Sequence, residues 1–85
     1  MKVLLAEDTR DLNRALTVML EYQGYEVDAV FDGQEAVEHI DADSYDAMIL
    51  DIMMPKKDGV EVIREVRSRK IVTPILLLTA KTQTH

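Results

Sequence analysis

Three short apolar runs in this chain each end at a residue whose side chain carries an oxygen. The runs and the residues that follow them are 2–6 before Glu7 and Asp8, 47–50 before Asp51, and 75–78 before Thr79. Almost uniformly apolar runs of this length are typical of parallel strands that are covered on both faces. Because the carboxyl ends of parallel strands meet at one edge of a sheet, where open α/β sheets bind ligands, we expect one site with three carboxylates and a hydroxyl.

The segments between these runs predict helices and one further strand. Apolar residues recur at helical spacing after the first run, and they are Leu12, Ala15, Leu16, Met19 and Leu20. Gly24 is expected to end this helix, and residues 25–30 alternate as an outer strand does. Asp32 with Glu35 resembles a capping box before a second helix, and Asp58 precedes a third. The order β-α-β-α-β-α-β predicts an α/β fold with right-handed crossovers and a parallel sheet.

The composition narrows the possible functions. The chain has 85 residues, no cysteine and a net charge of −6, so we expect one domain over residues 1–85 without disulfides or thiolate metal sites. Residues 1–55 carry 13 acids and 3 bases, which argues against nucleic-acid binding by that part. Neither a membrane span nor a signal-like start is present, and we expect a cytoplasmic location. Glycine-rich motifs of dinucleotide and P-loop sites are also absent from the sequence.

Carboxylates gathered at one sheet edge repel one another, so they share protons or hold a hard cation. Mg²⁺ suits Glu7, Asp8 and Asp51, and the backbone carbonyl of Met53 could fill a further position. Asp51 is also the best-placed nucleophile for accepting a phosphoryl group, with Thr79 as a hydrogen-bond donor to a phosphoryl oxygen. The residues therefore predict a metal-assisted phosphoryl acceptor rather than unrelated loop and helix-cap acids.

The chain resembles the N-terminal two-thirds of a bacterial response-regulator receiver domain. The motifs that carry the resemblance are Val3-Leu-Leu-Ala-Glu-Asp8, Asp46-Ala-Met-Ile-Leu-Asp-Ile-Met-Met-Pro55 with Asp58-Gly59, and Pro74-Ile-Leu-Leu-Leu-Thr-Ala80. The resemblance implies a flavodoxin-like sheet with strand order 2-1-3-4. It also implies the site residues: Glu7 and Asp8 as the acidic pair for Mg²⁺, Asp51 as phosphoacceptor and metal ligand, Met53 as carbonyl ligand, and Thr79 as switch hydroxyl.

The same resemblance implies a function in two-component signal transduction. A sensor histidine kinase would phosphorylate Asp51, and an output domain outside this chain would bind DNA and control transcription, so the module is not expected to be an enzyme in its own right. Receivers continue through a fourth helix, a fifth strand that ends in a lysine, and a fifth helix, so we expect a truncated receiver impaired in phosphorylation. Lys56 and Lys57 could replace that lysine only if their loop folded over the site.

Two alternatives remain open from the sequence. One is a self-associating folding fragment without signalling activity, in which copies join through the edge strand 75–78 and the apolar face of the first helix. The other is a metal-dependent hydrolase of the haloacid type, which also uses an aspartyl nucleophile. That motif needs a second acid two residues after the nucleophile, where this chain has Met53.

Overall fold

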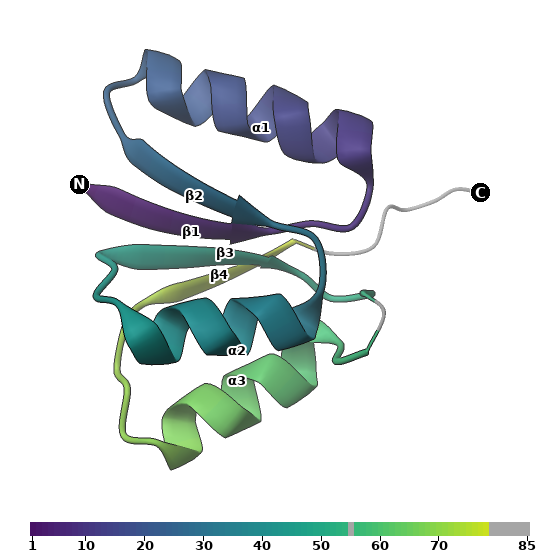
Figure 1. Cartoon of the computed structure of the whole chain (residues 1–85), viewed down its shortest axis with the longest axis vertical. Helices are drawn as coiled ribbons and strands as arrows, with labels where there is room; N and C mark the ends of the chain where they lie inside the picture. The colour runs from purple at the N-terminus through teal and green to yellow at the C-terminus, as the bar shows by residue number, and fades with distance from the viewer. Residues whose placement is uncertain (55, 79–85) are drawn as a thin grey trace.

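The computed structural model describes residues 1–54 and 56–78. Strands and helices alternate along them, and the elements are β1 (Lys2–Ala6), α1 (Arg10–Tyr22), β2 (Glu26–Val30), α2 (Gly33–Ala42), β3 (Ala47–Asp51), α3 (Gly59–Ser68) and β4 (Ile75–Leu78). The strands form one parallel sheet in the order β2-β1-β3-β4. Figure 1 shows α1 on one face of this sheet and α2 and α3 on the other. The predicted α/β order and strand order are confirmed.

The best-packed core lies between the sheet and the pair α2 and α3. Leu4, Met48 and Leu50 from the two central strands are fully buried, as are Val62 and Val66 from α3. The register places Ala6 of β1 beside Leu50 of β3, so the residues that follow these strands emerge side by side. This pairing brings the ends of β1 and β3 to one edge of the sheet.

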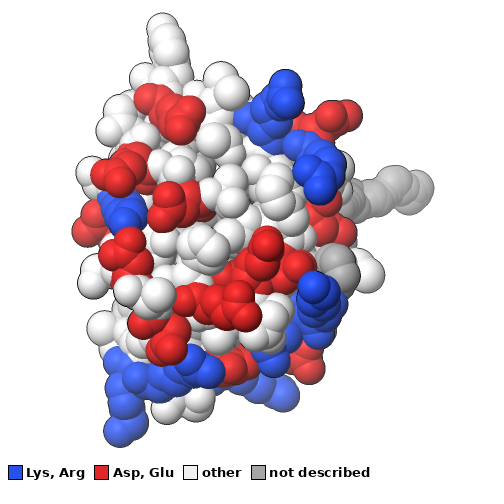
Figure 2. All heavy atoms as spheres, in the orientation of Figure 1, with Lys and Arg blue, Asp and Glu red and all other residues white. Residues whose placement is uncertain are grey.

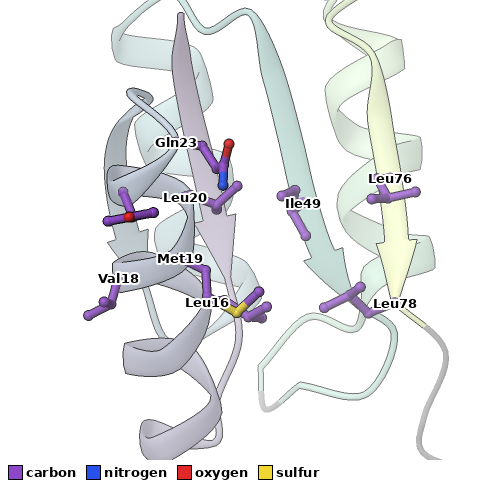
Figure 3. Close-up of a pocket in the computed structure, with 9 residues that line it drawn as sticks. Leu16, Val18, Met19, Leu20, Gln23, Ile49, Leu76 and Leu78 are labelled. Carbon is purple, nitrogen blue, oxygen red and sulfur yellow. The ribbon is translucent and has the colours of Figure 1, made fainter.

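The α1 side of the sheet is less completely covered. An apolar groove of about 420 Å³ runs between α1 and β4 (Figure 3), and its lining is Leu16, Val18, Met19, Leu20, Tyr22, Gln23, Ile49, Leu76 and Leu78. Leu12 and Met19 on α1 are 41% and 62% exposed, although both belong to the predicted apolar face. The helix was predicted correctly, but of its apolar face only Leu16 and Leu20 are half-buried.

Capping interactions explain where the helices begin and end. Gly24 has a φ of +96°, which is the left-handed conformation that glycine adopts readily, and it ends α1 as predicted. The Asp32 side chain accepts a hydrogen bond from the Glu35 amide (2.8 Å), and Asp58 forms a full capping box with Glu61 at the start of α3. No helix of the described part of the chain is long and apolar enough to cross a membrane.

Candidate functional site

Three carboxylates lie together at the ends of β1 and β3. Glu7 and Asp8 directly follow β1, and Asp51 is the last residue of β3. One oxygen from each of the three lies within 4.8 Å of the others. Glu7 and Asp51 are buried, with 1% and 4% of their surfaces exposed, whereas Asp8 is exposed. The structure thus brings together three of the residues predicted for the site and leaves one of them open to solvent.

The surroundings of Glu7 disfavour its negative charge. Burial raises the pKa of Glu7, and the negative charge of Asp51 raises that pKa further. One hydrogen bond opposes the shift, because the Thr9 amide donates to Glu7 Oε2 at 2.9 Å. Within residues 1–54 and 56–78, no lysine or arginine forms an ion pair with Glu7, Asp8 or Asp51. These hard oxygen donors, without an ion-pair partner in the described part of the chain, fit a divalent cation such as Mg²⁺.

Asn13 supports the site, and this role was not predicted from the sequence. It is the buried residue of α1, and its side-chain amide donates to the carbonyl oxygens of Glu7 and Val30, both at 3.0 Å. It therefore ties the end of β1 to the end of β2 and fixes the backbone that carries Glu7. A signal was present in the sequence, because Asn13 shares a helix face with the apolar Leu16 and Leu20.

The loop after β3 forms one wall of the site. Asp8, Ile52, Met53, Met54 and Asp58 line an open cavity of about 450 Å³. The Met53 side chain is 64% exposed, so its sulfur is not held in the core. Asp8 and Met53 thus face the same cavity, which is compatible with the predicted carbonyl ligand. The predicted switch hydroxyl, Thr79, lies outside the described residues.

The nearby lysines are engaged elsewhere. Lys56 Nζ lies 3.5 Å from Asp32, and Lys57 Nζ lies 3.1 Å from Glu65 on α3. Neither therefore supplies positive charge to the three carboxylates. Figure 2 shows lysine and arginine side chains gathered at the lower end of the molecule, where Figure 1 places α3. The acids Asp41 and Glu65 pair with Arg69 there, as expected for a solvated helix face.

Nearly the whole chain matches one known protein family. The sequence profile of the response regulator receiver domain matches residues 3–85. The chain belongs to the response regulator receiver family. Among curated relatives, the transcriptional regulatory protein DltR of Streptococcus agalactiae is 42% identical over 85 residues, which is all of this chain and 38% of DltR. The receiver chain thus spans well under half the length of that relative.

Solved receiver structures share the fold. The receiver domain of the Francisella response regulator 1452 has a TM-score of 0.91 and 34% identity, over 98% of this chain and 69% of that one. The response regulator TrrA from Thermotoga maritima, in complex with Mg(2+)-BeF, has a TM-score of 0.88 and 37% identity, over 95% of this chain and 70% of that one. These likenesses confirm the flavodoxin-like receiver fold that the motifs predicted.

Proposed function

We propose that this chain is the phosphoacceptor module of a two-component response regulator and that Asp51 receives the phosphoryl group. The observation that carries the proposal is the group of Glu7, Asp8 and Asp51, whose oxygens lie within 4.8 Å of one another at the sheet edge of a receiver fold. Asp51 is the last residue of a central strand: it is paired with Leu78 of β4, and the residue before it, Leu50, is paired with Ala6 of β1. A nucleophile held in this way is well oriented for displacement at phosphorus.

The proposed metal ligands are Glu7, Asp8, Asp51 and the Met53 carbonyl. Bound Mg²⁺ would neutralise negative charge on the carboxylates and on the incoming phosphoryl group. The exposed Asp8 leaves the site open on one side, which suits a metal that keeps several waters. The raised pKa of Glu7 supports this assignment, because a buried carboxylate without a countercharge gains most from a cation.

The proposed reaction is a transfer between two proteins. An oxygen of Asp51 forms the new bond to phosphorus, the bond from phosphorus to a histidine nitrogen of a sensor kinase breaks, and the nitrogen leaves with the electron pair. Thr79 would donate a hydrogen bond to a phosphoryl oxygen. We propose a cytoplasmic location and, through an output domain, control of transcription. The relative DltR is named as a transcriptional regulatory protein, and this name supports the proposed control of transcription.

We also propose that the 85-residue chain takes up phosphate slowly. Positive charge placed at the transferring group usually supports this reaction, but Lys56 and Lys57 are paired with Asp32 and Glu65. The test is to titrate the chain with Mg²⁺ by NMR and then to incubate it with acetyl phosphate, with intact-mass detection. We expect Mg²⁺ to shift the Glu7, Asp8 and Asp51 signals, and we expect a small labelled fraction that Asp51→Asn abolishes.

Each part of this proposal has its own contrary result. Label that persists in Asp51→Asn would refute the phosphoacceptor assignment. An absence of Mg²⁺-dependent shifts at Glu7, Asp8 and Asp51 would refute the metal site. Near-complete labelling of the unmodified chain would contradict slow uptake and leave the acceptor assignment intact.

The α1 and β4 surface favours a second candidate function, which is self-association. β4 lies at the edge of the four-stranded sheet in the described part of the chain, and Leu76 on it is 60% exposed. Figure 3 shows Leu76 and Leu78 facing Leu16 and Leu20 of α1 across Ile49. An exposed apolar edge strand is a template for pairing with another chain. We propose that two copies cover this surface for each other, through the β4 edge and the α1 face.

A further inference from the structure

The loop between β3 and α3 lies in close contact with the start of α2. A Cβ atom added at Gly33, the first residue of α2, would stand 2.0 Å from the Lys57 carbonyl oxygen and 2.6 Å from the Lys57 Cβ. Both distances are far shorter than the roughly 3.5 Å at which nonbonded heavy atoms pack. Among the described glycines, a positive φ occurs at Gly24 and not at Gly33. Backbone conformation therefore does not explain the glycine at position 33. The close approach of the loop therefore selects glycine at this position.

Further contacts hold the same loop. The Gly59 amide donates to the Ile52 carbonyl at 2.7 Å and closes the loop at its base. On the side that faces α2, Lys56 Nζ lies 3.5 Å from Asp32, the residue just before Gly33. Lys56 has a φ of +71°, a conformation that costs free energy in a non-glycine residue and persists where surroundings enforce it. The loop is thus fixed at its base and along the side that rests on Gly33.

We propose that Gly33 is a positioning residue for the metal site. It contributes no ligand, but it lets the loop lie against α2, so that Met53 faces the same cavity as Asp8. The proposal rests on the proposed function, in which the Met53 carbonyl completes the Mg²⁺ site. A methyl group at residue 33 would displace Lys57 by more than about 1 Å, and the displacement would pass along the short loop to Met53. Metal affinity is sensitive to such supporting contacts.

The experiment compares Gly33→Ala with a control on the same helix. His39→Gly changes an exposed residue of α2 that does not line the cavity, and it lowers helix stability because glycine is a poor helix former. We expect Gly33→Ala to weaken Mg²⁺ binding about tenfold, the order found when supporting residues of metal ligands are changed. We expect His39→Gly to bind Mg²⁺ as tightly as the unmodified chain does, because it leaves the loop contacts intact.

A measurement without metal tests the same contact directly. In the metal-free chain, NMR should show a nuclear Overhauser contact between Gly33 and Lys57, and Gly33→Ala should shift the Met53 and Asp58 amide signals while His39→Gly leaves them in place. Equal Mg²⁺ affinity in Gly33→Ala and His39→Gly would overturn the positioning role. If the unmodified chain binds no Mg²⁺ at all, the proposed function fails instead.

A second variant decides the matter if Gly33→Ala does not fold. Lys56→Gln removes the positive charge that pairs with Asp32, and its polar side chain is one atom shorter than that of lysine. Electrostatics alone predicts tighter Mg²⁺ binding, because a positive charge near an acidic site is lost. A loop held in position by this contact predicts weaker binding, by about twofold, since exposed ion pairs contribute little. Tighter or unchanged binding in Lys56→Gln would then overturn the proposal.

Discussion

The negative charge of Glu7 favours binding of a metal ion, but it destabilises the folded chain when no metal is bound. The side chain is 1% exposed, and burial together with Asp51 raises its pKa. Replacing it with glutamine keeps an acceptor for the Thr9 amide and removes the charge. Without Mg²⁺ at pH 7.5, we expect Glu7→Gln to raise the free energy of unfolding by about 1 to 3 kcal/mol. The upper bound is the repulsion between two full charges 4 Å apart, which is roughly 4 kcal/mol at a dielectric constant of 20. Urea denaturation with a chelator measures this.

The stability gained by Glu7→Gln should increase as the pH rises. A carboxyl group with a raised pKa binds more protons in the folded than in the unfolded state, so its contribution to stability falls as pH rises. For Glu7 the fall begins near its ordinary pKa of 4.5 and ends above its pKa in the folded protein. The advantage of Glu7→Gln should therefore be small at pH 4.5 and grow toward pH 7.5. Glu38→Gln, at an exposed position, is the control. If Glu7→Gln were stabilising by the same amount at every pH, the raised pKa of Glu7 would not be the cause.

Asn13 stabilises the backbone under the site. Its side-chain amide donates to the carbonyl oxygens of Glu7 and Val30, which share no other side-chain donor in the described residues. Asn13→Leu leaves both acceptors without that partner, and we expect a loss of about 1 to 3 kcal/mol in unfolding free energy together with weaker Mg²⁺ binding. Thermal and urea denaturation measure the loss. Arg14→Ala, at an exposed neighbour, should change neither quantity appreciably.

The residues of the site differ in how far the sequence reveals them. Glu7, Asp8 and Asp51 were predictable because each stands at the end of an apolar run, and parallel strands bring their ends together. Asn13 and Gly33 were not, because their roles depend on approaches that only the folded chain makes. Asn13 contacts two strands at once, and Gly33 is constrained by a carbonyl group on a distant loop. The local pattern places Asn13 on the apolar face of the first helix, but it does not show which groups Asn13 or Gly33 contacts.

At the scale of the elements, local signals placed most helix starts and ends. Gly24 ends α1, and Asp58 begins α3, as predicted. The strand expected over residues 25–30 begins instead at Glu26. The reason is a competing hydrogen bond, because the Tyr25 amide donates to the Leu20 carbonyl (3.1 Å) and completes the end of α1. A boundary of this kind depends on which of two elements uses one amide group.

The capping box of α3 joins the helix to the wall of the site. Asp58 accepts from the Glu61 amide at 2.9 Å, and Asp58 also lines the cavity that contains Asp8. Asp58→Ala should lower the unfolding free energy by about 1 kcal/mol, because the first turn of α3 loses its cap. Asp58→Asn should retain most of that stability, since asparagine caps equally well. A similar loss in both variants would show that the charge of Asp58, and not its cap, stabilises the helix.

At the scale of the whole molecule, the two faces of the sheet are unequally covered. Val62 and Val66 of α3 and Ala36 of α2 are fully buried on one face. On the other face, Val18, Met19 and Leu76 around the α1 and β4 groove are between 58% and 62% exposed. Sequence periodicity identifies an apolar helix face but does not say what covers it. The self-association alternative drawn from the sequence already assumed that the first helix face and the 75–78 strand are exposed, and the structure adds which residues line the groove between them.

This unequal coverage leads to a prediction about self-association. If copies join through β4, Leu76→Lys places a charge in the shared surface, and we expect dimerisation at least tenfold weaker, since burying one leucine contributes about 1.5 to 3 kcal/mol. Val72→Lys is the matched control, because Val72 is 84% exposed and lies outside the groove. Sedimentation velocity over a range of concentrations measures both variants.

The net charge adds a second arm to this experiment. Two copies of charge −6 repel each other, and salt screens that repulsion over about 10 Å at 0.1 M. Association through an uncharged groove should therefore strengthen as salt rises, whereas association held by ion pairs would weaken. Leu76→Lys and Val72→Lys reduce the net charge equally, so a difference between them isolates the position of the side chain. Equal dimerisation of these two variants, or a monomer at every concentration, would refute the α1 and β4 surface as an interface between copies.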